Sequence, residues 1–342
     1  MIKKLLCLIT ILAIFHFPSY ADLKKVVSIG SDDINYRFFG VAGAVLDDQG
    51  NVYICDSKGS FLRKYDSDGK FIKEIGRYGQ GPGEFSNTIS GLYLCDGLFV
   101  LDTGNNRIVE LDQELNIRRY IKLSKLALSI MGFSDNLYMI SRTPGRFSFE
   151  VGVYDRNGNY IKSFFDRRPV FIERIEQSKI GQALSLIYSS IAATVERETG
   201  EVAITFQWPG ENIEIFRFSK DGEFIKKIVS DHIIKYDFPE FRLKGLPTNL
   251  RFPDQSNLIM IRSIHSLDEK RLLLEYWVNE YNLDKVVKEN EYILIVDRNS
   301  GQLVHRELLP LKSGIADARK SYICAISNEG DVPEVVIYRL DY

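Results

Sequence analysis

Gly50-Asn51-Val52-Tyr53-Ile54-Cys55-Asp56 is followed by Tyr65-Asp66-Ser67-Asp68-Gly69-Lys70-Phe71-Ile72, and then by Leu98-Phe99-Val100-Leu101-Asp102-Thr103-Gly104-Asn105-Asn106. These stretches alternate short apolar runs with turns built from Asp, Asn and Gly. The apolar runs are rich in Val, Ile, Tyr and Phe, which favour strands, and the turn residues tolerate a positive φ or cap their own backbone. The pattern predicts antiparallel strands joined by tight turns, without crossover helices.

The same order of strand and turn recurs along the whole chain. The turn before the last strand of each unit recurs at intervals of roughly 40 to 50 residues where no insertion intervenes, a period typical of propellers. The sixth unit lacks a last strand, whereas the N-terminal run Val26–Ile29 is a strand without a unit. We therefore predict an all-β fold, a six-bladed β-propeller of four-stranded antiparallel blades. Its ring would be closed by Val26–Ile29 pairing with Val335–Leu340, which removes exposed sheet edges.

The fifth unit is the hardest to divide. We place its strands at Thr248–Phe252, Leu258–Ile261, Tyr292–Val296 and Gln302–Leu308, which leaves Ser266–Glu291 as an insertion. The run Leu272–Val278 inside it fits either a strand or a short amphipathic helix, since periodicity cannot decide so short a segment. It would serve as an exposed flap for a partner or as a buried support for the blade, and we favour the buried support.

Two motifs of the second unit carry a family resemblance. Asp102-Thr103-Gly104-Asn105-Asn106-Arg107-Ile108, with Gly79-Gln80-Gly81-Pro82-Gly83-Glu84-Phe85 before it, resembles the NHL repeat of six-bladed propellers. Exported bacterial six-bladed propeller proteins are similar in layout. The resemblance implies that Asp56 and Asp102 cap their own turns and that Arg107 braces the neighbouring loop. It leaves the function open, because propellers host lyases, lactonases and binding modules alike.

The N-terminus is typical of a signal peptide. Lys3 and Lys4 precede the apolar run Leu5–Phe17, and small residues flank a cleavage site near Ala21. The alternative, a membrane anchor, needs a longer run to span roughly 30 Å of hydrocarbon. We predict a signal peptide over residues 1–21 and a propeller over 22–342, exported to the periplasm or the extracellular space, with no transmembrane segment in the mature chain.

Charge and cysteine content narrow the function classes. The net charge of −2 gives no basic excess for binding nucleic acid. The mature chain keeps Cys55, Cys95 and Cys324, too few and too sparse for a disulfide framework. Cys55 and Cys324 occupy equivalent places in the first and sixth units, and we expect them to be buried thiols.

One face of the ring is the predicted working surface. The connections between second and third strands, and those between blades, open on the same face, and long loops of this kind are often functional. The longest are Asp166–Gln182, Asp231–Gly245 and Ser266–Glu291.

The candidate ligand-binding residues for this face are Arg142, Arg146, Trp208, Arg262 and His265. Arg142 and Arg262 would hold a carboxylate or phosphate through forked hydrogen bonds. Trp208 would stack on a sugar or ring, or pack against Pro209.

The sequence contains few of the motifs that are typical of catalytic sites. The mature chain has three histidines, at 232, 265 and 305, which do not suggest a metal trio. A calcium site of Asp and Asn oxygens near the axis stays open, and no G-x-S-x-G occurs. We assign no catalytic or metal-ligating residue and no cofactor.

The leading hypothesis is a non-enzymatic module that binds a small molecule, glycan or protein at the loop-rich face. The alternative is a lactonase- or lyase-like enzyme with calcium in the central channel. A scaffold acting through Leu272–Val278 is a third.

Overall fold

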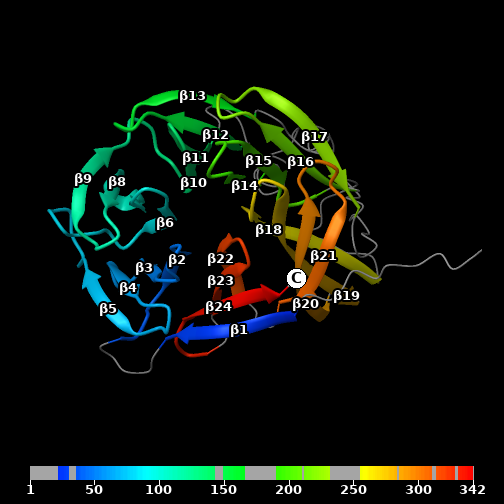
Figure 1. Cartoon of the computed structure of the whole chain (residues 1–342), viewed down its shortest axis with the longest axis horizontal. Coiled ribbons are helices and arrows are strands. Elements are labelled where there is room, and N and C mark those ends of the chain that lie inside the picture. Colours follow the sequence, from blue (N-terminus) through cyan, green and yellow to red (C-terminus); the bar gives the residue numbers. More distant parts are fainter. Residues whose placement is uncertain are drawn as a thin grey trace, which may run out of the picture.

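The computed structural model describes residues 22–30, 36–142, 149–165, 190–209, 212–231, 255–282, 285–309, 313–327 and 330–341. Within these ranges the chain forms six four-stranded antiparallel sheets arranged around a central axis (Figure 1). Each sheet is a blade whose first strand is nearest the axis and whose last strand is on the outside. The predicted all-β six-bladed propeller is confirmed.

The first three blades are built from short strands. Blade one consists of β2 (Val41–Leu46), β3 (Val52–Asp56), β4 (Phe61–Tyr65) and β5 (Phe71–Ile75). Blade two consists of β6 (Ile89–Leu94), β7 (Leu98–Asp102), β8 (Arg107–Leu111) and β9 (Ile117–Lys122), with a 3-10 turn η1 (Thr103–Asn105) between β7 and β8. Blade three consists of β10 (Ser129–Phe133), β11 (Leu137–Arg142), β12 (Phe149–Tyr154) and β13 (Tyr160–Phe164).

The last three blades include the ring closure. Blade four consists of β14 (Ile191–Val195), β15 (Val202–Phe206), β16 (Ile213–Phe218) and β17 (Phe224–Ser230). Blade five consists of β18 (Gln255–Ser266), β19 (Arg271–Asn282), β20 (Lys285–Asp297) and β21 (Leu303–Leu308). Blade six consists of β22 (Ser313–Arg319), β23 (Tyr322–Ser327) and β24 (Glu334–Asp341), completed by β1 (Asp22–Ile29).

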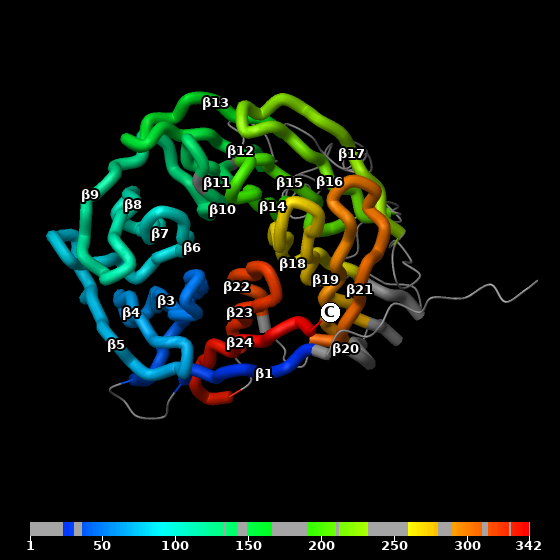
Figure 2. Tube along the Cα trace, in the orientation of Figure 1, coloured from blue at the N-terminus to red at the C-terminus, as the bar shows by residue number. Residues whose placement is uncertain are grey.

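The N-terminal strand closes the ring as predicted. β1 pairs antiparallel with β24, with Val27 opposite Ile337 and Ile29 opposite Val335. Figure 2 shows β1 and β24 side by side in the same blade. Because β1 supplies the outer strand that the C-terminal segment lacks, the first and last blades are joined by main-chain hydrogen bonds rather than by loops alone.

The turns confirm the role of Asp and Asn. In the hairpin of blade two, Asp112 Oδ1 accepts hydrogen bonds from the backbone N–H groups of Glu114 at 2.9 Å and Asn116 at 2.8 Å. Asp155 caps the corresponding hairpin of blade three in the same way, through Asn157 and Asn159. These backbone and amide hydrogen bonds hold the pKa of both Asp carboxyls below the ordinary value.

The core lies between neighbouring blades rather than in one central mass. Tyr53 and Leu62 of blade one, for example, pack in one apolar cluster with Leu98 and Val100 of blade two. The second strands β3, β7 and β15 are buried along their whole length, whereas the outer strand β5 has exposed positions. The axis is therefore left to the inner strands, whose side chains line the channel.

Blade five corrects the predicted strand division. Leu258–Ile261, predicted as the second strand, belongs to the innermost strand β18, and Ser266–Glu291 is not an inserted loop. Its central part is β19, the true second strand, and Leu272–Leu274 are fully buried, as expected of a buried support. The hairpin between β18 and β19 turns through Leu267–Lys270, which contains no Gly or Asn, and the prediction did not recognise it as a turn. The predicted strand Thr248–Phe252 lies outside the described residues.

The three innermost strands of blade five are unusually long. β18 and β19 pair from Gln255 opposite Asn282 to Ser266 opposite Leu272. The outer strand β21 covers only the part of β20 from Tyr292 to Val296. Blade five therefore extends beyond its own outer strand, on the face where the second and third strands of each blade are joined. Of the two other predicted long connections, Asp166–Gln182 lies outside the described residues, and so does Asp231–Gly245 apart from Asp231.

Candidate functional site

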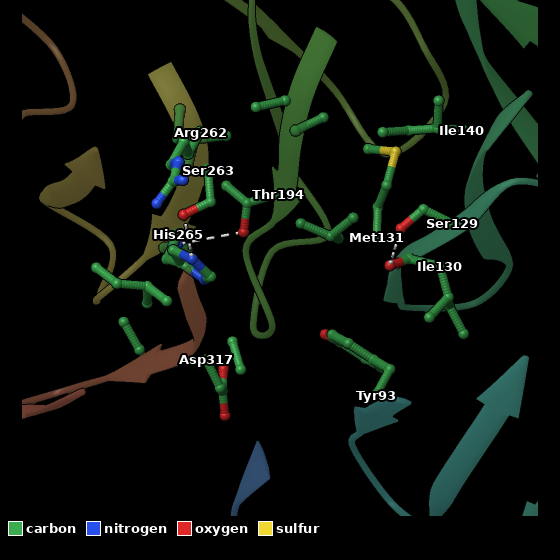
Figure 3. Close-up of a pocket in the computed structure, with 18 of the residues that line it drawn as sticks. Tyr93, Ser129, Ile130, Met131, Ile140, Thr194, Arg262, Ser263, His265 and Asp317 are labelled. Atoms are coloured by element: carbon green, nitrogen blue, oxygen red, sulfur yellow. Dashed lines mark hydrogen bonds between the residues drawn. The ribbon is translucent and has the colours of Figure 1, made fainter. Parts of the chain in front are cut away.

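A cavity of about 360 Å³ occupies the central channel. All six inner strands contribute to its lining, for example through Val45 of β2, Tyr93 of β6 and Thr194 of β14. Figure 3 shows Tyr93 directing its hydroxyl toward the middle of the cavity, opposite His265 and Asp317. A cavity of this size is at the lower end of the range for small-molecule sites, about 300–1,000 Å³.

The β18 side of the cavity carries a hydrogen-bonded chain. Ser263 and His265 are two residues apart on the strand, so their side chains leave it on the same face. His265 Nε2 lies 2.9 Å from Ser263 Oγ, and that hydroxyl donates to Glu275 Oε2 of β19 at 2.7 Å. Burial lowers the pKa of His265 to about 4, so the imidazole is neutral near neutral pH.

Glu275 is the buried end of this chain. Its side chain is 1% exposed, and Oε2 also accepts a hydrogen bond from the backbone N–H of Ile315 in blade six at 3.2 Å. Burial and, to a smaller extent, the nearby Glu291 raise the pKa of this carboxyl to about 7, against the lowering effects of Ser263 and Arg262. Glu275 thus joins the inner strand of blade five to that of blade six.

Arg262 connects the chain to the projecting part of blade five. Its Nη1 donates to Glu291 and lies 3.8 Å from Glu275. Its guanidinium carbon lies 5.6 Å from the centre of the Trp277 ring, and its carbonyl oxygen accepts a hydrogen bond from Gln207 Nε2 at 3.1 Å. This arginine is therefore held by acidic groups on β19 and β20 while it lines the cavity.

Arg197 and Asp317 form the second charged group of the channel. Arg197 Nη2 lies 3.4 Å from Asp317 Oδ1, and the backbone N–H of Leu46 donates to Asp317 Oδ2 at 3.3 Å. The guanidinium carbon lies 5.6 Å from the centre of the Tyr93 ring. Burial lowers the pKa of Arg197, but the charge of Asp317 outweighs it and the pKa is raised. The arginine is therefore charged at any ordinary pH.

The structure brings together two of the five predicted ligand-binding residues. Arg262 and His265 both line the cavity, but from the innermost strand rather than from the end of a second strand. Trp208 follows β15, as the strand assignment predicts, and is half-buried. Arg142 is the last residue of β11, and its side chain lies outside what the structure describes. Arg146 lies outside the described residues.

Asp102 and Arg107 are held in a dense polar network. Asp102 Oδ1 accepts hydrogen bonds from the backbone N–H and the hydroxyl of Ser86, and Oδ2 accepts from Asn105 Nδ2 and Arg107 Nε. Arg107 also donates to the carbonyl oxygens of Gln80 and Glu84, in the loop before blade two. All these contacts are within the chain.

Asp56 occupies the equivalent place in blade one. Its Oδ1 accepts from the backbone N–H of Gly59, and its Oδ2 accepts from the backbone N–H groups of Phe39 and Gly40. Like Asp102, it is fully buried. These contacts fasten the turn after β3 to the segment that leads into blade one.

Sequence reasoning missed the rest of the channel. Arg197, Asp317, Ser263 and Glu275 were not singled out, and Tyr93 was read only as part of a strand. Asp317 is on β22, and Arg197 is in the turn directly after β14. Aligning the inner strands of the six units would have pointed to Tyr93, Ser263 and Asp317, because inner strands face the axis. Arg197, in a turn, and Glu275, on the second strand β19, carry no such signal.

Cys55 and Cys324 are buried thiols, as expected. Cys55 and Cys324 are fully buried and free, and burial raises the pKa of both. Cys95 is free and half-buried. Among the described residues, no three His, Cys, Asp or Glu side chains lie where they could share a metal ion. No helix in the described part of the chain is long and apolar enough to cross a membrane.

Comparisons with known proteins agree with the architecture. A family model described as a 6-bladed beta-propeller matches residues 38–188. The chain is a six-bladed β-propeller. A Bacteroides fragilis protein described as exported superposes with a TM-score of 0.58 at 14% identity, over 95% of this chain and 96% of that one.

Other solved structures are more distant. A member of the DUF4221 family from Bacteroides vulgatus gives a TM-score of 0.55 at 9% identity, over 94% of this chain and 98% of that one. Virginiamycin B lyase from Staphylococcus aureus gives a TM-score of 0.47 at 12% identity, over 93% of this chain and 99% of that one. No curated protein matches the chain. Identities this low indicate the fold alone.

Proposed function

We propose that this chain is an exported, non-enzymatic binding protein that takes a small molecule into its central channel from the loop-rich face. The observation that supports it best is the cavity at the axis, to which all six inner strands contribute and which brings hydroxyl, imidazole and guanidinium groups together. Concave sites with a few converging polar groups are the usual form of small-molecule sites. Export is supported by the signal-like N-terminus and by the exported protein of similar fold.

The bonding within the channel favours binding over catalysis. The Ser263 hydroxyl donates to Glu275, so it is not directed at His265 as a nucleophile would be toward its base. Asp317 is engaged by Arg197 and by the backbone of Leu46. The polar groups are thus positioned by one another, as suits a preorganised site that orients a ligand.

The test uses the mature chain beginning at Asp22. It would be screened by thermal shift against sugars, sugar acids, hydroxy acids and amino acids, and each compound that raises Tm would be titrated by calorimetry. Ser129→Phe places a ring in the cavity from β10 and should abolish binding. Ser28→Phe, the same substitution on the exposed outer strand β1, should leave binding unchanged.

Two outcomes would count against the proposal. Ligands that bind Ser129→Phe as tightly as the parent chain would place binding elsewhere. Turnover of lactones, esters or glycans by the purified protein, together with calcium found by elemental analysis, would favour the lactonase- or lyase-like alternative.

A further inference from the structure

Among the described residues that line the central cavity, Arg197 is the one charged residue that also borders neighbouring cavities. It lines the central cavity, and it also lines two neighbouring cavities of about 310 and 490 Å³. These two are bordered by the hairpins that join first and second strands, at Asp47–Gln49 and at Leu267–Lys270. The guanidinium therefore lies where the channel meets its mouth on the face opposite the long loops.

The hydrogen bonding of Arg197 is incomplete. Its Nη2 reaches Asp317 at 3.4 Å, which is long for a charge-assisted hydrogen bond. Its Nη1 is buried and has no acceptor in hydrogen-bonding geometry among the described residues, although the Tyr93 side chain is near enough to help raise the pKa of Arg197. A buried donor left without a partner costs about 1–3 kcal/mol, and more when it is charged. Such a group calls for a water, an ion or a ligand oxygen.

The chemistry of the neighbours indicates which oxygen. A carboxylate matches the planar fork of a guanidinium and is its strongest neutralising acceptor. Asp317 already supplies one negative charge beside Arg197, so a doubly charged phosphate would meet more repulsion than a singly charged carboxylate. The remaining lining includes Ser129, Thr194 and the neutral imidazole of His265, which suit hydroxyl groups of a ligand (Figure 3).

We propose that Arg197 binds the carboxylate of a small hydroxylated monocarboxylic acid, of the sugar-acid or hydroxy-acid class, held in the central cavity. This assignment rests on the proposed function, because it names the ligand class of the same channel. Asp317 holds the guanidinium in place, and the ligand carboxylate binds the part of the Arg197 side chain that lines the cavity. The hydroxyl groups of the ligand then face Ser129, Thr194 and His265.

The experiment is a calorimetric titration of the mature chain with three acids and two matched compounds. The acids are D-glucuronate, D-gluconate and L-lactate; D-glucose lacks the carboxylate, and glucose 6-phosphate replaces it with a dianion. At least one acid should bind, about tenfold or more tighter than glucose and glucose 6-phosphate, because a charge-assisted hydrogen bond contributes at least about 1.4 kcal/mol.

Variants separate Arg197 from its surroundings. Arg197→Gln should weaken acid binding about tenfold or more without changing glucose binding. Arg319→Gln, at the same mouth but paired with Asp48 at 2.9 Å, is the matched control and should bind as the parent chain does. Asp317→Asn keeps Arg197 and removes the competing charge, so it should tighten acid binding. The Asp317→Asn variant keeps the test valid if thermal melting shows that Arg197→Gln is unstable.

The outcomes distinguish this inference from the proposed function. If glucose binds and Ser129→Phe abolishes it, but no acid is preferred and Arg197→Gln has no effect, the inference is wrong and the channel function stands. If no acid binds the parent chain, the ligand class is wrong. If no compound of any class binds in the channel, both fail.

Discussion

Glu275 offers the sharpest test of the reasoning about the channel wall. It is a carboxyl with 1% exposure, hydrogen-bonded to Ser263 and to the backbone of Ile315 across the junction of blades five and six. The charged groups facing it are Arg262, on β18, and Glu291, on β20. Burial raises its pKa from 4.5 to about 7, so the ionised form is the unfavourable one in the folded protein.

The size of the effect of Glu275 on the unfolding free energy follows from the linkage between proton binding and folding. A group whose pKa is higher in the folded state contributes stability that is fully present below its unfolded pKa and is lost as the pH rises through its folded pKa. For Glu275 the window therefore runs from about pH 4.5 to above pH 7. At about 1.36 kcal/mol for each pKa unit, the rise from 4.5 to about 7 corresponds to about 3 kcal/mol.

Glu275→Gln removes the titration while keeping the shape and an acceptor oxygen for Ser263 and Ile315. The difference in unfolding free energy between the variant and the parent chain should therefore shift in favour of the variant by about 3 kcal/mol as the pH rises from about 4.5 to about 8. Urea unfolding at a series of pH values would measure it, followed by the fluorescence of the two tryptophans, Trp208 and Trp277. Ser263→Ala tests the direction of the effect. It removes a hydrogen bond that lowers the pKa of Glu275, so the loss of stability should extend to higher pH than in the parent chain.

Parallel stability profiles for the parent chain and Glu275→Gln across this pH range would refute the argument. Such a result would mean that Glu275 is ionised at little cost in the folded protein, and that the junction of blades five and six is far more polar than its contacts indicate.

Three further predictions concern the scaffold. Asp102→Ala removes the acceptor of Arg107 Nε and of the buried backbone N–H of Ser86, and should cost about 3–5 kcal/mol in urea unfolding. Asp66→Ala, which removes an exposed turn cap, should cost roughly 1 kcal/mol; equal costs would contradict the network described for Asp102. Deletion of residues 22–30 removes the outer strand of blade six and exposes the edge of β24, so Tm should fall and size-exclusion chromatography should show association; an unchanged Tm would argue against closure by β1. Thiol titration of the mature chain should find three free cysteines in denaturant, with those buried in β3 and β23 unreactive in the native state; a count of one would mean that a disulfide joins them.

The sequence by itself determined the number of blades and the closure of the ring. Both depend on local signals: strand-forming runs alternating with Asp, Asn and Gly turns, and one spare strand at the N-terminus for one missing at the C-terminus. Turns such as Asp112–Asn116 fold through contacts within a few residues, so their positions are visible in the sequence. At Leu267–Lys270 the hairpin has a capping Asp268 but no Gly or Asn, and there the strand division of blade five was wrong.

Only the tertiary structure decided which residues meet at the axis. Arg197 and Asp317 are 120 positions apart in sequence, and Glu275 contacts Ile315 in the next blade. A strand pattern fixes which side chains share a face of one sheet, but it does not fix which inner strands face one another across the channel. That arrangement comes from the packing of blade against blade, where buried clusters such as Tyr53 and Leu62 against Leu98 and Val100 set the angle of each sheet. The elements are therefore local properties of this chain, whereas the candidate site is a property of the closed ring.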